Sequence, residues 1–151
     1  MISHEPIVWN DSYLTGVERI DEQHQVLVNT LNEANERLAN GVTRDLLEQI
    51  TRELLSYALY HFETEEELMA ENDYAARAAA DNDRHRQEHR GFSQKVVAIR
   101  EGLKDGRLVS REELLGFLNA WLVNHILNTD KKLAAYLLER GSGQASAPRP
   151  G

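Results

Sequence analysis

The sequence contains no cysteine among its 151 residues. This absence excludes disulfides, thiolate metal sites, iron–sulfur clusters and a cysteine nucleophile. Any metal ion must therefore be bound by nitrogen and oxygen ligands.

Basic residues are also scarce, and long apolar runs are missing. Seventeen Lys and Arg residues against 25 Asp and Glu residues give a formal charge of −8, which argues against nucleic acid or an anionic membrane surface as a partner. No segment approaches the ~20 apolar residues needed to span a bilayer, and the N-terminus lacks the basic and apolar character of a signal peptide. We expect a cytoplasmic monomer that binds a small neutral ligand or a metal cation.

Four stretches carry apolar residues at the three- and four-residue steps of an amphipathic helix. Short connections join them, which predicts an all-α fold, an up-down-up-down antiparallel four-helix bundle with an N-terminal extended arm. We expect one domain over residues 1–140. The predicted elements are an arm over 1–19, helices at about 21–40, 44–72, 81–104 and 111–139, and a flexible tail over 141–151.

Local signals mark some helix ends. Thr43 is expected to cap the second helix, and Ser110 with Glu113 forms the pattern of a capping box at the start of the last one. In the last helix the inward positions step by five residues, from His125 to Asp130. That step places the two side chains about 140° apart on a regular helix, so it predicts an irregularity of the π-bulge type near residues 128–129.

Histidines and carboxylates recur on these apolar stripes. Two pairs are spaced by four residues, so both members of each pair point from one helix face. A single histidine on such a stripe is usually a hydrogen-bonded core residue. Burying this many imidazoles and carboxylates near one core layer would cost several kcal/mol for each unpaired charge unless cations compensate them. The predicted metal ligands are His24, His61, Glu65, His85, His89, His125 and Asp130.

The size of this ligand set indicates two metal ions. One octahedral ion cannot use five imidazoles and two carboxylates, whereas two ions can. Two bridging carboxylates and one bridging oxo or hydroxo group would then leave a single open coordination position for a small ligand. Iron and manganese suit nitrogen and carboxylate ligands, and closed tetrahedral zinc would leave ligands unused. We favour iron.

Short motifs surround these ligands in a definite order along the chain, and together they resemble the hemerythrin family in its bacterial single-domain form. The resemblance covers about residues 9–138. One departure is that the segment between Tyr74 and His85 is longer than is usual in the family. The motifs are Trp9 before Gly16-Val17, Ile20-Asp-Glu-Gln-His24, His61-Phe-Glu-Thr-Glu65-Glu66, His85-Arg-Gln-Glu-His89, and Trp121-Leu-Val-Asn-His125 followed by Asp130.

The resemblance implies a role for each ligand. The two iron ions would be bridged by both carboxylates and by an oxo or hydroxo group, and one iron would keep an open position. By the resemblance, His85, His89 and His125 hold the coordinatively complete iron, His24 and His61 hold the open one, and Glu65 and Asp130 bridge them.

The function predicted from these residues is reversible dioxygen binding at a non-heme diiron centre, for oxygen transport, storage or delivery. The Glu-x-x-His repeats of ferritin-like diiron oxidases are absent, so we expect no enzyme beyond a weak oxidase or peroxidase side activity. The alternatives are an oxygen, redox or nitric-oxide sensor, and a peroxidase- or oxidase-type enzyme at the same centre. Iron storage is disfavoured because a closed bundle has no cavity for mineral.

Several apolar or aromatic residues near the ligands are candidate pocket walls, and the alternative for each is a plain core role. Leu27 lies one turn after His24 on the same stripe and is the first residue to test. We expect Glu63, Glu66 and Glu67 to be solvated and His4 to be exposed. The candidate pocket residues are Leu27, Trp121, Phe62 and Tyr57.

Overall fold

The structure is a computed structural model that describes residues 7–140, and this part of the chain is helical without any β-strand. The predictions for His4 and for the tail over 141–151 lie outside the described residues. The elements are a 3-10 turn η1 (Asp11–Tyr13), helices α1 (Glu18–Arg37), α2 (Arg44–Glu71), α3 (Tyr74–Arg77), α4 (Ala79–Lys104) and α5 (Arg111–Asn124), a π-helix η2 (His125–Asp130), and helix α6 (Lys131–Glu139).

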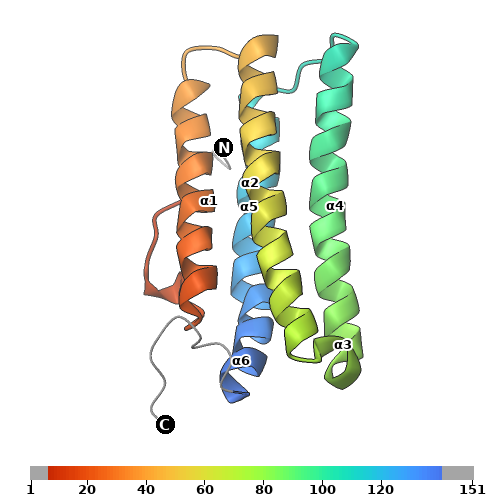
Figure 1. The fold of residues 1–151 in the computed structure, drawn as a ribbon. Coiled ribbons are helices and arrows are strands. Elements are labelled where there is room, and N and C mark those ends of the chain that lie inside the picture. Colours follow the sequence, from red (N-terminus) through yellow and green to blue (C-terminus); the bar gives the residue numbers. More distant parts are fainter. Residues whose placement is uncertain (1–6, 141–151) are drawn as a thin grey trace.

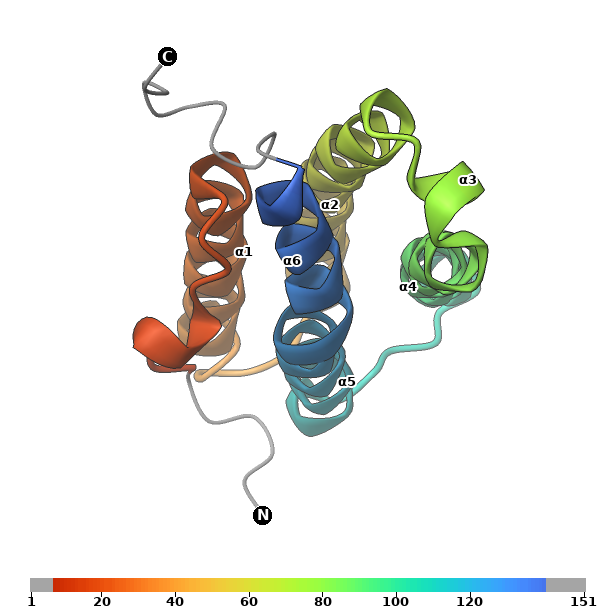
Figure 2. The same cartoon turned by 90° about the horizontal axis from the view of Figure 1, so that it is seen from below.

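The long helices lie side by side, and the chain reverses direction at each connection between them (Figure 1). Helices α5 and α6 are continuous through η2 and run the length of α1. Seen along the helices, α1, α2, α4 and the α5–η2–α6 segment surround a shared interior, with α3 beside α4 (Figure 2). This arrangement lets side chains from four directions meet in one layer.

The first helix begins at Glu18, before the predicted start at about residue 21, and Val17 is its N-terminal flanking residue. The Asp21 carboxylate lies inside the first turn and accepts hydrogen bonds from the backbone N–H groups of Thr15 at 2.8 Å and Gly16 at 3.2 Å. It also accepts a hydrogen bond from the Thr15 hydroxyl. Asp21 thus ties the preceding loop to the helix, and an acidic residue of the first turn suits the positive end of the helix dipole.

The predicted caps of the other helices are confirmed. The Thr43 hydroxyl accepts a hydrogen bond from Leu46 N at 3.1 Å. Ser110 and Glu113 form the full capping box, each side chain accepting from the backbone N–H of the other at 3.0 Å. These bonds satisfy backbone donors that the start of a helix leaves unpaired.

The longer segment after Tyr74 is helical. Asp73 adopts a left-handed conformation with φ 59° and turns the chain out of α2. Helix α3 and the first turn of α4 follow, so α4 starts at Ala79. Tyr74 is buried at this end of the molecule, and the Tyr136 hydroxyl from α6 donates to the carbonyl of Asn72. The connection is therefore packed against α6.

Apolar side chains form two separate clusters along the interior. The larger one, the main cluster, includes Leu27, Leu54, Phe92 and Leu118, and the smaller one, the end cluster, packs the α3 and α6 end of the molecule. The predicted metal ligands lie near the boundary between the two clusters on α1, α2 and the α5–η2–α6 segment, and in the N-terminal half of α4. The end cluster comprises Val17, Ile20, Leu68, Met69, Tyr74, Leu133, Ala134 and Leu137.

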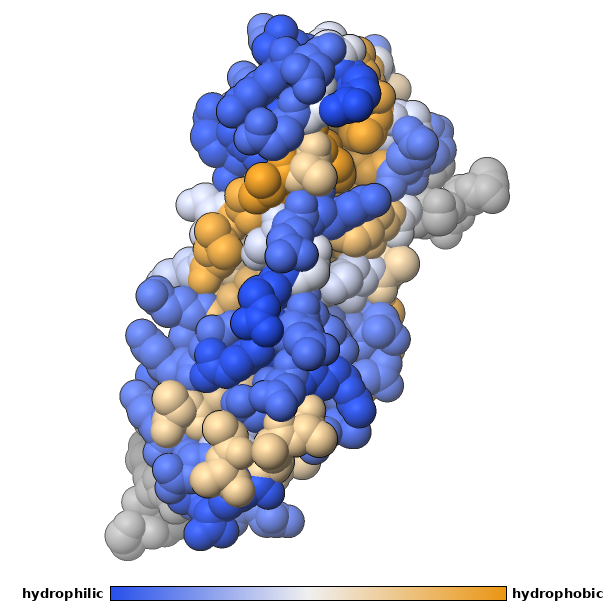
Figure 3. All heavy atoms as spheres, turned by 90° about the vertical axis from the view of Figure 1, so that its right-hand side faces the viewer, coloured by the Kyte–Doolittle hydropathy of each residue, from blue (hydrophilic) through white to orange (hydrophobic). Residues whose placement is uncertain are grey.

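The outer surface on the α4 side is largely hydrophilic, with a hydrophobic band across its upper half (Figure 3). Leu59 and Val97 are among the large apolar residues exposed on the molecule. Within residues 7–140, no helix combines the length and the apolar character that a transmembrane span requires.

Candidate metal centre

The segment from His125 to Asp130 is a π-helix, which confirms the irregularity predicted near residues 128–129. The wider turn brings the two side chains to the same point, with His125 Nε2 3.0 Å from Asp130 Oδ1. Both residues are buried. A regular helix would direct Asp130 far around the axis from His125.

All seven predicted ligands come together in one buried layer between the two apolar clusters, and none is more than 2 % exposed. Within the layer they form two overlapping groups whose potential ligand atoms all lie within 4.8 Å of one another. Glu65 belongs to both. The three-histidine side consists of His85, His89 and His125 with Glu65, and the two-histidine side consists of His24 and His61 with Glu65 and Asp130.

Each carboxylate divides its two oxygens between these sides. Oε1 of Glu65 lies 3.0 Å from His85 Nε2 and 2.9 Å from His89 Nε2, whereas Oε2 lies 3.2 Å from His61 Nε2. Asp130 repeats this division.

The oxygens of Asp130 face opposite ways across the layer. Oδ1 lies 3.2 Å from His85 Nε2, and Oδ2 lies 2.7 Å from His24 Nε2. Glu65 and Asp130 thus each direct one carboxylate oxygen toward each set of imidazoles.

Several atoms that face the centre lack a hydrogen-bond partner among the described residues. They include the Nε2 atoms of three imidazoles and most of the carboxylate oxygens. Buried polar atoms are seldom left unpaired, because each costs about 1–3 kcal/mol. As metal ligands, these nitrogen and oxygen atoms fit two cations, which would satisfy them. The unpaired atoms are Nε2 of His24, His61 and His125, Oε2 of Glu65, and both carboxylate oxygens of Asp130.

The outward-facing nitrogens of three imidazoles are held by side chains on neighbouring helices. His61 Nδ1 lies 2.6 Å from Gln23 Oε1 on α1. His89 Nδ1 lies 2.9 Å from Glu66 Oε2 on α2, and His125 Nδ1 lies 2.6 Å from Glu88 Oε1 on α4. Partners of this kind fix the orientation of metal-binding histidines and leave Nε2 free for the metal.

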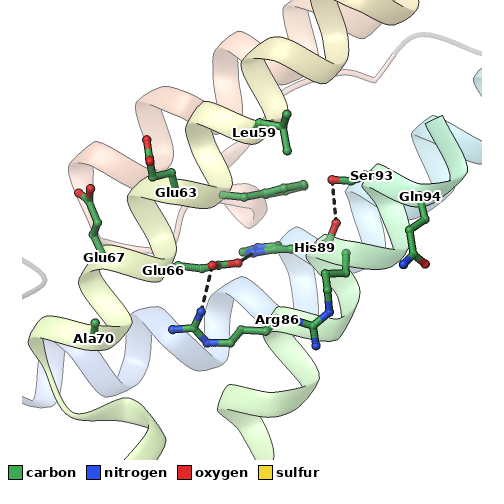
Figure 4. Close-up of a pocket in the computed structure, with 11 residues that line it drawn as sticks. Leu59, Glu63, Glu66, Glu67, Ala70, Arg86, His89, Ser93 and Gln94 are labelled. Atoms are coloured by element: carbon green, nitrogen blue, oxygen red, sulfur yellow. Dashed lines mark hydrogen bonds and ion pairs between the residues drawn. The ribbon is translucent and has the colours of Figure 1, made fainter. Parts of the chain in front are cut away.

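Glu66, which we expect to be solvated, is partly exposed but also contacts two side chains of α4. Its carboxylate points from α2 to His89 and Arg86 on α4, whereas Glu63 and Glu67 point away from them (Figure 4). The hydrogen bond from His89 lowers the pKa of Glu66, and the hydrogen bond from His125 likewise lowers the pKa of Glu88. Both glutamates are therefore ionised at neutral pH.

The three outer partners were missed by the analysis of the apolar stripes because none lies on a stripe. Gln23, Glu66 and Glu88 each adjoin a predicted ligand in the sequence: His24, Glu65 and His89. An adjacent residue points about 100° away around the helix, toward the next helix instead of the centre. That adjacency is the signal that could have identified them.

The carboxylates and imidazoles of the centre also influence one another's protonation. Burial alone would lower the pKa of His24, but the carboxylates of Asp130 and Glu65 outweigh burial and raise it to about 9. His85 shows the same balance, with Glu65 as the main carboxylate, and its pKa also rises to about 9. Burial favours neutral Asp130, yet the imidazoles of His125 and His24 hold its pKa well below its ordinary value.

The protein groups alone therefore favour positive charge beside ionised carboxylates. A metal cation can supply that charge by displacing the protons from the imidazoles.

A small apolar cavity adjoins the layer within the main cluster. Its volume is about 10 Å³, the lower limit for holding a single water molecule. Leu27, Phe62 and Trp121 line it, whereas Tyr57 does not. The Phe62 ring stacks on His89 at 4.0 Å and the Trp121 ring on His125 at 4.4 Å. Two of the rings that line the cavity thus pack directly against imidazoles of the three-histidine side.

Comparison with known proteins agrees with this geometry. Residues 15–137 match the Hemerythrin HHE cation binding domain. A protein named Bacteriohemerythrin from Pseudomonas aeruginosa (strain LESB58) is 34% identical over 124 residues, which cover 82% of this chain and 76% of the relative. Bacteriohemerythrin from Clostridium acetobutylicum is 30% identical over 83% of this chain and 96% of its own length.

A solved structure described as wild-type hemerythrin is also similar. It has a TM-score of 0.75 at 25% sequence identity, covering 88% of this chain and 98% of that structure. The family match spans most of the chain, including all seven predicted ligands. The chain belongs to the hemerythrin family.

Proposed function

We propose that this protein holds two iron ions in the buried layer and binds dioxygen reversibly there, as an oxygen carrier or store. The observation that supports this most strongly is the division of the oxygens of Glu65 and Asp130 between two sets of imidazoles. A single metal ion would need only one side of each carboxylate. Two ions use both sides.

The ligand assignment follows the two sides of the layer. The histidines of the three-histidine side would complete one ion, and His24 and His61 would hold the other ion, which is left one ligand short. When bound, the iron pair supplies the electrons for reversible O₂ binding at the open position. Five imidazoles that bind as neutral ligands would leave the iron pair less electron-rich than a carboxylate-rich set would.

The surrounding residues contribute by excluding water. Leu27 continues the stripe of His24 into the cavity that adjoins the layer, and the cavity lining is apolar. An apolar shell of this kind controls solvent access to a metal centre. It would admit a small uncharged molecule such as O₂ and slow the water-assisted oxidation of the centre.

We interpret the fold as an up-down-up-down four-helix bundle preceded by an N-terminal arm and forming one domain. In this interpretation α5, η2 and α6 are one helix interrupted by the π turn, and α3 is a turn within the connection from α2 to α4. The backbone of Ile7 supports the arm, since it exchanges two hydrogen bonds of 2.9 Å with the Asn32 side chain on α1. Four helices would then each supply ligands.

The test is to reduce the iron-loaded protein without air, count iron per chain and follow the visible spectrum as air is admitted and removed. Two irons and a charge-transfer band that appears with O₂ and disappears without it support the proposal. Rapid, irreversible conversion to the diferric form would instead favour a sensor or an enzyme. Less than one iron per chain would refute the ligand assignment.

A further inference from the structure

The two sides of the metal layer differ in the side chains that hold their histidines from outside. On the three-histidine side, the acceptors are carboxylates: Glu88 for His125 at 2.6 Å and Glu66 for His89 at 2.9 Å. On the two-histidine side, the acceptor of His61 is the amide of Gln23 at 2.6 Å. One histidine on each side, His24 and His85, has no hydrogen-bond partner for Nδ1 within residues 7–140, so the difference between the sides lies in the partners of the other three.

The neighbours of Gln23 define which of its amide atoms faces the histidine. The Thr64 hydroxyl donates to the carbonyl of Tyr60 at 3.2 Å, so its oxygen is free to accept from Gln23 Nε2, also at 3.2 Å. The Gln23 oxygen is left facing His61 and accepts the Nδ1 proton. The outer partner of His61 is therefore a neutral acceptor with a defined orientation.

The charge of the acceptor changes the strength of the imidazole as a ligand. A carboxylate draws the Nδ1 proton toward itself more strongly than an amide does, since hydrogen bonds to ionised groups are roughly twice as strong. The electron density on Nε2 rises, and the imidazole becomes a stronger donor to a metal. Such donors favour the higher charge state of the ion they bind.

We propose that Glu88 and Glu66 are positioning residues that make the two metal positions unequal. Through His125 and His89 they make the three-histidine side the tighter position and the one that better stabilises ferric iron. Gln23 leaves the two-histidine side weaker, so the position with the open coordination site is also the one that is easier to reduce. This inference rests on the proposed two-metal centre.

The contributions of the two glutamates differ. Glu88 accepts a hydrogen bond from the Thr129 hydroxyl at 2.7 Å in addition to the one from His125. This second hydrogen bond fixes the position of the Glu88 carboxylate. Glu66 is shared with Arg86, whose guanidinium lies 3.0 Å away and offsets part of its charge (Figure 4). Glu88 should therefore have the larger effect.

The experiment is a titration of the metal-free full-length chain with Co²⁺ alone, followed by visible absorption. The wild type should bind two ions in two resolved steps. In Glu88→Gln, the tighter step should weaken by about 10- to 100-fold, with a smaller loss in Glu66→Gln and an unchanged weaker step in both. Glu63→Gln is the matched control, because Glu63 lies on the same helix as Glu66 but points away from His89.

Gln23→Glu tests whether a charged outer acceptor strengthens metal binding, here by adding a carboxylate instead of removing one. A carboxylate facing His61 should strengthen the weaker Co²⁺-binding step and bring the affinities of the two steps closer together. This variant tests the inference even if Glu88→Gln does not fold. Glu88→Asp keeps the charge and should restore part of the tighter step. With iron bound, potentiometric titration should show the lower of the two reduction potentials rising in Glu88→Gln and remaining unchanged in Glu63→Gln.

Two results would overturn the inference: equal affinity of wild type and Glu88→Gln in both steps, or the same loss in Glu66→Gln, Glu88→Gln and Glu63→Gln, which would indicate only net charge. The proposed oxygen binding fails separately, because its test is the reversible spectrum of the wild-type iron protein. Two unequal Co²⁺ steps without that spectrum would support the inference and refute oxygen binding.

Discussion

The two apolar clusters on either side of the metal layer hold the helices together in different ways. The main cluster packs α1, α2, α4 and α5 against one another over most of their length. The end cluster consists of eight buried residues at the other side of the layer and is closed by α3 and by the Tyr136 to Asn72 hydrogen bond. We expect the larger main cluster to keep the helices associated without metal and the smaller end cluster to depend on the metal layer beneath it.

The position of the ligand layer between the two apolar clusters has an energetic consequence. A layer of buried imidazoles and carboxylates between two apolar regions is costly unless cations occupy it. Bound metal ions would stabilise the fold at its least apolar point, because any ligand that binds only the folded state adds to stability.

The largest effect is expected when a shared ligand is removed. Glu65→Gln should lose both metal ions, because an amide cannot bridge the two sides as a carboxylate does. His61→Ala should retain the ion of the three-histidine side and lose the other. Iron analysis of the purified variants measures the difference, with exposed Glu63→Ala as the control that keeps both ions. Equal loss of both ions from His61→Ala would contradict the division of the layer.

Removal of the metal should loosen the end cluster more than the main cluster. Chelation forfeits binding energy that amounts to about 4 kcal/mol when the free ion is at 1,000 times its Kd. Hydrogen exchange of the metal-free protein should accelerate most at the C-terminal turns of α2, in α3 and in α6, with the amides of the main cluster still protected. Uniform acceleration along all helices would refute this difference between the clusters.

A change in the wall of the cavity should affect the centre from the side of the main cluster. Leu27→Ala enlarges the cavity next to the layer, so water should enter more easily and oxidation of the O₂-bound protein should accelerate. It should also destabilise the fold by about 2–5 kcal/mol. Leu114→Ala removes an equally buried leucine of the same cluster that does not line the cavity. If both variants oxidise at the same rate after correction for stability, the cavity does not control access.

The smallest effect concerns the loop that enters the end cluster. Asp21→Ala removes the acceptor of the Thr15 and Gly16 N–H groups and should cost about 0.5–2 kcal/mol, as the loss of a helix cap does. Glu22→Ala, exposed on the same turn, should be close to neutral. Thermal denaturation compares the two. An Asp21 variant as stable as the Glu22 variant would remove the role assigned to this carboxylate.

Much of the centre could be predicted from the sequence because its ligands lie on apolar stripes, where a histidine or carboxylate stands out. The five-residue step from His125 to Asp130 even predicted the π-helix, since only a widened turn directs both side chains inward. The family match then confirms the hemerythrin resemblance.

Two features could not be read from spacing. The first helix starts before Asp21 because that carboxylate bonds backward to a loop, a contact that helix periodicity does not encode. Gln23, Glu66 and Glu88 act on histidines of neighbouring helices, and their partners become known only once the helices are packed. Surface-facing acids such as Glu63 and Glu66 look alike in the sequence, although only Glu66 contacts a histidine.

The central claim is that the buried layer holds two iron ions that share Glu65 and Asp130. The most direct measurement is a crystal structure of the iron-loaded protein with diffraction recorded on both sides of the iron absorption edge. We expect two anomalous peaks, one contacting the three-histidine side and one contacting His24 and His61, with both carboxylates between them. A single peak, or a metal that shows no iron edge, would contradict the account.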